Sequence, residues 1–361
     1  MFIKKLDFYL LRFFFVTLFV VTLAIGFTII IINMVEELRD FIDHQVPLLS
    51  ILEYYLYFGG WVVKSFFPVF IMLATLFSVS MLARRNEILA MKASGVSLYR
   101  ITLPFLLVAG LLAYFHFSYN EYIFPPANKK RLEIKRFTIE KKSKDALARI
   151  HNIYRQIKPG YFYTITSFNS TRQEGNDFRL YKSEDNRLSQ IITSENIFYR
   201  DHVWRLENVV IRNFDDSANE LFTRQDTLTL FDIKDRPADF ARRIGKPEDM
   251  GYDELKRYIE LMKRTGGPYA REAIDLRMKF AYPITSIIVV LISIPFASNP
   301  RRGGIAVSFA TGAMLALIYF VLLRMMQSAG YNEKIPQEVA VWGVNGVFLL
   351  AGLILMLKAK K

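Results

Sequence analysis

Long uncharged apolar stretches alternate with charged segments along this chain. Each stretch is about 19 to 23 residues long, and roughly 20 helical residues cross the hydrocarbon core of a bilayer. Helices buried in soluble proteins seldom stay uncharged for that length, so we predict six membrane-spanning helices. The six windows are Phe13–Val35, Ser65–Ala83, Ile101–Asn120, Phe280–Pro300, Gly303–Leu323 and Val339–Leu357.

The first window also has the position of a signal peptide, since Lys4, Lys5 and Arg12 precede it. Its apolar run is too long for the core of a typical signal peptide. Bulky Ile29–Ile32 stand where small residues are expected before a cleavage site. We therefore expect an uncleaved first span.

The segment between the third and fourth windows has a different pattern. Lys129–Ala148 has helical spacing and heavy charge, which predicts a continuation of the third span out of the membrane. The period then changes to two, in β-branched and aromatic runs separated by turn residues, which indicates an antiparallel sandwich or jelly roll. Helical spacing returns in Tyr252–Thr265, and Gly266–Gly267 ends it. The predicted strands are Phe162–Phe168, Phe178–Lys182, Leu188–Tyr199, Val203–Phe214 and Glu220–Leu230.

These patterns predict a polytopic α-helical membrane protein of six spans, three plus three, with an inserted antiparallel β-jellyroll domain. The expected division is residues 1–124 for the first three spans, 125–272 for the β domain with helical connectors, and 273–361 for the last three spans. An open β sandwich has edge strands that can accept a strand of another protein. A lid that packs only on its own membrane part fits the pattern equally well.

Charge gives the predicted spans an orientation. Basic residues concentrate in the N-terminus, the loop after span two, the turn after span four and the C-terminus, and such short basic segments face the cytoplasm. The loop after span one is acidic instead. Both termini are therefore expected in the cytoplasm and the β domain on the opposite side. The basic residues are Lys4, Lys5, Arg12, Arg84, Arg85, Lys92, Arg100, Arg301, Arg302, Lys358, Lys360 and Lys361.

The formal net charge of +13 exceeds what these anchors require. Further cations lie outside the membrane, in Lys129–Arg136 and Arg242–Lys246. An anionic lipid headgroup is one partner for such a surface, and a solvated basic face is the other explanation. The 361 residues are 52% hydrophobic and 22% charged, and they include no cysteine, so the outer domain needs no disulfides.

No catalytic motif is present. The sequence has no GxxxxGK[ST], HExxH or GxSxG pattern, and its four histidines lack metal-ligand spacing. We predict no catalytic residue, no metal site, no cofactor and no nucleic-acid partner for this chain. The energy for any transport must come from a partner or from an ion gradient.

The loop Leu82–Arg100, LARRNEILAMKASGVSLYR, carries the most information. Asn86 can cap a short helix over Glu87–Ala93, and Gly95 can end it. This helix can present Glu87 and a small apolar face to a groove on a cytoplasmic protein. An interfacial helix that only anchors the loop, with Glu87 balancing local charge, fits the same pattern.

The segment ARRNEILAMKASGVS closely resembles the coupling-helix motif of the LptF/LptG (YjgP/YjgQ) lipopolysaccharide-export permeases. The resemblance covers nearly the whole chain, because the plan of three spans, a β domain and three spans also agrees. Three further features carry it: the LD-x-Y start at Leu6–Tyr9, the pair Phe67–Pro68 and the turn Asn299–Pro300–Arg301. The start favours the LptG side of the family, whereas the turn is more like the LptF side.

The resemblance implies a permease in the bacterial inner membrane that pairs with a paralogous subunit, LptF or LptG, around an outward-facing cavity. The pair would sit on two copies of the ATPase LptB, which binds ATP and Mg²⁺, and spans one and five would line a lateral gate. The β-jellyroll domain would pass lipopolysaccharide through LptC to the periplasmic bridge. The implied ATPase-coupling residues are Arg84, Arg85, Glu87, Leu89, Ala90, Met91 and Gly95.

Several cations lie near the outer ends of the predicted spans, where the phosphates of an anionic lipid lie. Arginine can hold phosphate with a fork of two donors, and lysine acts as a compact charge. Simple snorkelling to the interface is the alternative for each cation. At the end of span one, where family members often carry basic residues, only Arg39 keeps the charge. The candidate lipid-binding residues are Asn33, Glu36, Arg39, Lys64, Arg277 and Arg324.

The sequence thus predicts a permease subunit, not itself an enzyme, that extracts lipopolysaccharide and hands it to the β domain. Two alternatives remain open. One is a permease for another anionic lipid or a lipoprotein, and the other is a membrane scaffold whose β domain binds partner strands without transport.

Overall fold

The computed structural model describes residues 5–142, 149–184, 187–214, 220–233, 235–240, 250–264, 269–298 and 304–358. The chain divides into two compact units. The larger unit holds Met1–Ile134, Gly245–Lys256 and Ala270–Lys361, and the smaller holds Lys135–Ile244 and Arg257–Tyr269. The turn Asn299–Pro300–Arg301, the basic segment Arg242–Lys246 and Gly266–Gly267 lie outside the described residues.

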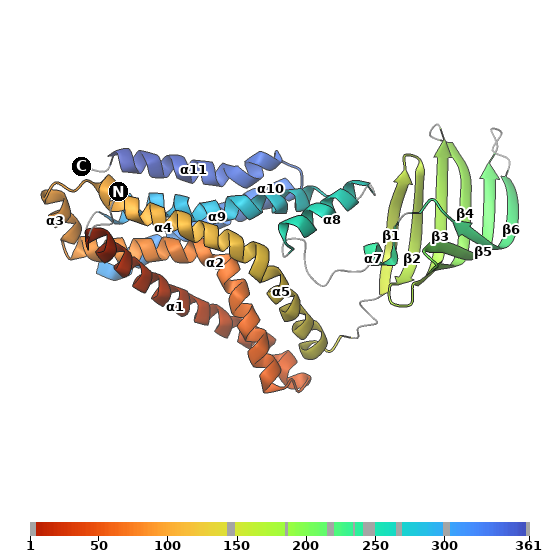
Figure 1. Cartoon of the computed structure of the whole chain (residues 1–361), viewed down its shortest axis with the longest axis horizontal. Helices are drawn as coiled ribbons and strands as arrows, with labels where there is room; N and C mark the ends of the chain where they lie inside the picture. The colour runs from red at the N-terminus through yellow and green to blue at the C-terminus, as the bar shows by residue number, and fades with distance from the viewer. Residues whose placement is uncertain are drawn as a thin grey trace. The chain divides into compact units, whose positions relative to one another are not determined.

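The larger unit is a bundle of helices long and apolar enough to cross a membrane, and the six predicted spans are confirmed. The short helix α3 (Glu87–Ala93) lies at one end of this bundle, the end at which the N- and C-termini also lie (Figure 1). The long helices are α1 (Lys5–Asp43), α2 (Leu48–Arg84), α4 (Leu98–Ser118), α9 (Ala270–Ala297), α10 (Gly304–Tyr331) and α11 (Gln337–Lys358).

Helix α2 bends in its course, as Figure 1 shows, and it contains Pro68. Proline has no N–H group, so the carbonyl of Lys64, four residues earlier, loses its helical donor. The ring of His116 on α4 supplies a replacement, with Nε2 3.1 Å from that carbonyl oxygen. The hydroxyl of Tyr282 on α9 donates to the neighbouring carbonyl of Ser65. Two helices therefore stabilise the bend.

The third span continues as a helix beyond membrane length, as predicted, but the helix ends at Ile139. The last part of the predicted stretch Lys129–Ala148, residues 143–148, lies outside the described residues. Helix α4 runs on through a π-helical turn, α5 and a second π-helical segment. Pro125 and Pro126 open α5 and leave the carbonyls of Glu121 and Tyr122 without helical donors, so the chain widens into the π turn just before them. The segments are η1 (Tyr119–Ile123), α5 (Phe124–Glu133) and η2 (Ile134–Ile139).

The smaller unit contains a six-stranded antiparallel sheet, which confirms the inserted β domain. The strands lie in sequential order from β1 to β6, so successive strands pair as a meander, and the jelly roll stays a prediction. Only a few residues of sequence separate successive strands, and a short connection pairs a strand with its neighbour in sequence. The strands are β1 (Arg149–Lys158), β2 (Tyr161–Asn169), β3 (Glu174–Glu184), β4 (Arg187–Arg200), β5 (Val203–Phe214) and β6 (Glu220–Leu230).

At one level of this sheet, a residue of each strand has no partner in the pairing register of the neighbouring strands. The alternation of side chains changes phase there. On β5, for example, Trp204 and Leu206 are buried before the break and Val209 after it. The period-two pattern of the sequence did not reveal this break. On β2 to β6 the unpaired residues are Thr166, Asp177, Glu195, Asn208 and Asp226.

Left-handed backbone accompanies the break. Asp177 and Asn208 both have φ 54°, a conformation that Asp and Asn adopt more readily than other non-glycine residues. The hydroxyl of Thr166 donates to the Asp177 carboxylate at 2.8 Å. This hydrogen bond and those from Arg179 hold the pKa of Asp177 below its ordinary value. Local side-chain contacts therefore stabilise the break.

The apolar face of the sheet is covered by the segment that follows β6. Phe240, at the end of α7 (Pro237–Phe240), packs on Trp204 with ring centroids 5.6 Å apart. The indole of Trp204 donates to the carbonyl of Asp235 at 2.8 Å. The return helix α8 (Tyr252–Arg264) then confirms the helix predicted over that segment.

Candidate coupling helix and cationic cavity

The bounds of α3 agree with the helix expected over Glu87–Ala93, but its N-terminal cap does not. Asn86 occupies the cap position with φ 59°, and its side chain makes no capping hydrogen bond. Asn86 therefore serves the turn through its backbone conformation. At the other end Gly95 has φ 88°, and the amide of Val96 donates to the Met91 carbonyl at 3.0 Å. This pattern is a Schellman motif, which needs a left-handed residue at Gly95.

Helix α3 has one buried and one exposed side. Ile88 is 2% exposed and anchors the helix, whereas Leu89 is 62% exposed. Ala90 and Ala93 are exposed with Leu89, which gives a small apolar face that points away from the bundle. Of the other predicted coupling residues, Arg84, Arg85 and Gly95 are exposed, and Met91 is half-buried.

The side chain of Glu87 is held in place at the start of this face. The hydroxyl of Tyr9, on α1, donates to Glu87 Oε2 at 2.7 Å. Arg85 Nη1 lies 4.0 Å from Glu87 Oε1. The carboxylate is only 28% exposed, so its orientation is fixed by its neighbours before any partner binds.

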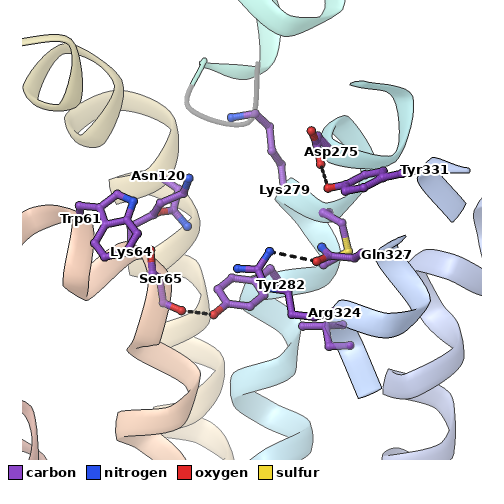
Figure 2. A pocket seen from close by; sticks show the side chains of 12 residues that line it. Trp61, Lys64, Ser65, Asn120, Asp275, Lys279, Tyr282, Arg324, Gln327 and Tyr331 are labelled. Atoms are coloured by element: carbon purple, nitrogen blue, oxygen red, sulfur yellow. Dashed lines mark hydrogen bonds between the residues drawn. The ribbon is translucent and has the colours of Figure 1, made fainter. Parts of the chain in front are cut away.

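A cavity of about 160 Å³ lies between α2, η1, α9 and α10 (Figure 2). Lys64 of α2 lines this cavity. At 1.5 Å per helical residue, Lys64 lies about 30 Å along α2 from the end of the helix that leads into α3. The cavity and α3 are therefore at opposite ends of the bundle. Its lining residues are Trp61, Lys64, Ser65, Asn120, Asp275, Met278, Lys279, Tyr282, Leu323, Arg324, Gln327 and Tyr331.

Cations dominate the charged groups of this cavity, which has three of them and one carboxylate. Arg324 Nη1 donates to Gln327 Oε1 at 3.1 Å. Because Gln327 is neutral, this contact does not compensate the positive charge of Arg324. Lys279 Nζ lies 3.3 Å from Glu121 Oε2 in a pair that is almost fully buried. The one carboxylate, Asp275, accepts a hydrogen bond from the Tyr331 hydroxyl (Figure 2). Such a site suits an anionic group.

The structure gathers two of the six predicted lipid-binding residues, because Lys64 and Arg324 both line the cavity. The other four are elsewhere. Arg277 pairs with Glu338 at 2.5 Å. On α1, Arg39 is paired with Asp43 at 3.3 Å, Glu36 is exposed, and Asn33 accepts a long hydrogen bond of 3.5 Å from Tyr54.

Sequence reasoning left Lys279 out of the site and put Arg277 in. Helical spacing contains the signal that separates them, because residues four and seven positions apart share a face. Asp275, Lys279 and Tyr282 have this spacing and all line the cavity, while Arg277 falls on another side of α9. The same spacing joins Arg324, Gln327 and Tyr331 on α10.

Comparison with known proteins decides the family. The family profile described as lipopolysaccharide export system permease LptF/LptG matches residues 8–358. The chain belongs to the LptF/LptG family. Two curated relatives are both named lipopolysaccharide export system permease protein LptG. The protein of Escherichia coli (strain K12) is 21% identical over 300 residues, which cover 82% of each chain. That of Haemophilus influenzae (strain ATCC 51907 / DSM 11121 / KW20 / Rd) is 19% identical over 290 residues, covering 79% of this chain and 77% of the relative.

Family membership accounts for the architecture. The LptF/LptG match extends over the spans and the inserted β domain alike, so both units belong to the family's permease. The prediction of a multi-pass permease of a lipopolysaccharide export system is thereby confirmed.

Proposed function

We propose that this chain is an LptG-type permease subunit that couples a separate cytoplasmic ATPase, through α3, to a lipid cavity at the other end of the bundle. The observation that carries this proposal is the exposed apolar face of α3 beside an oriented Glu87, in a chain of the LptF/LptG family. A leucine and two alanines offer a shallow surface that fits a groove on another protein, and Glu87 adds a directional charge.

The orientation follows from charge at the α3 end of the bundle. The hydroxyl of Tyr99, at the start of α4, donates to the Met356 carbonyl near the end of α11 at 3.2 Å. The basic loop around α3 and the basic C-terminus therefore share one end of the bundle. Short basic segments mark the cytoplasmic side, so α3 faces the cytoplasm and the cavity faces the periplasm.

The cavity suits a phosphorylated lipid headgroup. Lys64, Lys279 and Arg324 line it, and Arg324 can offer two parallel donors to a phosphate. Lipopolysaccharide enters from the membrane, and the β unit receives it for transfer to the periplasmic bridge through LptC. ATP and Mg²⁺ bind to a dimer of the ATPase LptB, and a paralogous LptF subunit completes the cavity.

Assignment to LptG over LptF is supported by the relatives named above, which are both LptG proteins. The LD-x-Y start at Leu6–Tyr9 points the same way.

The test replaces Glu87 with arginine, and Glu53→Arg on the exposed surface of α2 is the matched control. Mild-detergent purification should recover LptB with the control and much less with Glu87→Arg. ATP-dependent release of lipopolysaccharide from membranes should fall in parallel. Equal LptB recovery and equal release in the two variants would refute the coupling role. If only a different anionic lipid is released, the coupling role of Glu87 stands and the assignment of lipopolysaccharide as the cargo is rejected.

A further inference from the structure

The first turns of α1 are joined to the segment that carries α3 by an ion pair between buried Asp7 and half-buried Arg100. Asp7 accepts two hydrogen bonds from Arg100, at 2.6 Å to Nη1 and 2.7 Å to Nη2. Arg100 lies in the first turn of α4, directly after the α3 loop. Asp7 is only 5% exposed. Separating the pair would leave a buried carboxylate without its main partner, so the two residues move together.

Two further contacts join α1 to the beginning of the same segment. Tyr9 donates its hydroxyl hydrogen bond to Glu87 at 2.7 Å. One turn further along α1, the guanidinium of Arg85 lies 5.8 Å from the centroid of the Phe13 ring. Both ends of the docking segment, residues 85–87 and residue 100, are therefore attached to α1. We call Asp7 and Tyr9 the α1 clamp.

Helix α1 is buried mainly in its first half, from Asp7 to Val21, and again at Glu37 and Phe41 near its other end. None of its described residues between Val21 and Glu37 is buried. Helix α2, by contrast, is buried over most of its apolar window. The attachments at the α3 end therefore have a large share in setting the direction of α1.

We infer that Asp7 and Tyr9 are positioning residues that transmit movement of α3 to α1. This inference rests on the proposed docking of an ATPase at α3. When the ATPase displaces α3, the clamp pulls the first turns of α1 with it, and the exposed middle of α1 changes its distance from α4. Without the Asp7 side of the clamp, α3 still docks, but α1 does not follow.

The absence of cysteine makes this movement measurable. Val20→Cys on α1 and Leu107→Cys on α4 place spin labels at exposed positions, because these side chains are 56% and 68% exposed. The full complex with its ATPase is reconstituted in lipid nanodiscs, and the distance between the labels is measured with and without ATP and vanadate. The pair of cysteines is introduced into the protein with the unaltered clamp, into Asp7→Asn, and into the control Glu53→Gln.

With the clamp intact, nucleotide should shift the distance between the labels. In the Asp7→Asn protein, which keeps the hydrogen bond from Tyr9 to Glu87, the shift should become much smaller although LptB still co-purifies. Lipid-stimulated ATP hydrolysis should fall roughly fivefold or more, because fivefold is the lower end of the range that is typical of energetic coupling between distant sites. Glu53→Gln changes only an exposed side chain of α2, so it should behave as the unaltered protein.

An exchanged pair separates positioning from folding. Asp7→Arg combined with Arg100→Asp restores the opposite charges, and it should recover a clear part of the nucleotide-dependent shift. A shift that stays undiminished in the Asp7→Asn protein, a shift that is absent from the unaltered protein, or an exchange that recovers nothing would each overturn the inference. Failure of the proposed function gives a different result, namely that Glu87→Arg retains LptB.

Discussion

At the scale of single residues, Pro68 and His116 show how one side chain compensates for another. Pro68 frees the carbonyl of Lys64, and the buried ring of His116 binds it at 3.1 Å. An unsatisfied buried carbonyl costs about 1–3 kcal/mol. The histidine thus stabilises a bend next to the cavity, since Lys64 itself is one of the lining residues.

A double-mutant cycle tests this compensation. His116→Phe should lower the stability of the protein in detergent by about 1–3 kcal/mol, because the Lys64 carbonyl loses its donor. In a Pro68→Ala background the backbone supplies an N–H group, so the same change should cost clearly less. Thermal unfolding of the four proteins measures the difference. Equal costs in both backgrounds would contradict the account of the bend.

The cavity arginine can be tested against a nearby arginine outside the site. Arg324→Gln should weaken lipopolysaccharide binding to the purified permease by roughly tenfold, since hydrogen bonds to charged groups contribute about 1.5–3 kcal/mol. Arg277→Gln, which removes only the surface pair with Glu338, should change binding little. Titration with labelled lipopolysaccharide gives both constants. Equal effects would mean that the cations act only through general surface charge.

The choice between Arg277 and Lys279 also shows the limit of sequence reasoning at this scale. Counting residues from the end of a span gives depth, and Lys64 and Arg324 were found in this way. Depth does not say which side of a helix faces the neighbouring helices. That side is decided by packing, as in the ion pair of Lys279 with Glu121.

At the scale of elements, α3 was predictable because both of its ends have local causes. Gly95 is left-handed with φ 88°, and the sequence placed a glycine where the helix needed to stop. The conformation of Asn86 was not predictable, because asparagine can cap with its side chain or adopt a left-handed backbone. The structure selects the second.

The end of α3 gives a prediction of its own. Gly95→Ala should destabilise this turn by about 1–2 kcal/mol, the cost of left-handed backbone for a residue with a Cβ atom. Gly95→Asn should cost less, because asparagine tolerates this conformation. Recovery of LptB with each variant measures the effect on docking. If alanine and asparagine behave alike, the backbone at Gly95 does not control the position of α3.

The strands show a second limit at this scale. A period of two identified the strands, and β5 and β6 agree with the predicted ranges. The line of unpaired residues that includes Asp177 and Asn208 changes the phase of every strand at one level, and no single strand reveals it. Pairing order was likewise absent from the sequence pattern, so the sequential order of the strands could not be predicted.

At the scale of the whole molecule, the last three spans are joined by a buried polar network. The hydroxyl of Tyr319 on α10 lies 2.8 Å from both Thr285 on α9 and Asn345 on α11. Polar side chains of this kind join helices where no water competes for them. The network therefore holds together α9 and α10, which line the cavity, whereas α1 has no buried described residue between Val21 and Glu37.

The three-plus-three arrangement could be predicted because charge is excluded from the spans, and the position of α3 follows from the topology. The connection between α3 and a cavity about 30 Å away could not, since it depends on contacts such as Tyr9 with Glu87 that join distant parts of the chain. The central claim is that docking at α3 drives lipid out of that cavity.

The most direct test places a photo-crosslinking aromatic amino acid at Trp61, which lines the cavity. Crosslinking to lipopolysaccharide is measured in the reconstituted complex with and without ATP. The account predicts that ATP lowers the yield, and that Glu87→Arg removes this response while crosslinking without ATP remains. A yield that ATP leaves unchanged, or a response that survives in Glu87→Arg, would contradict it.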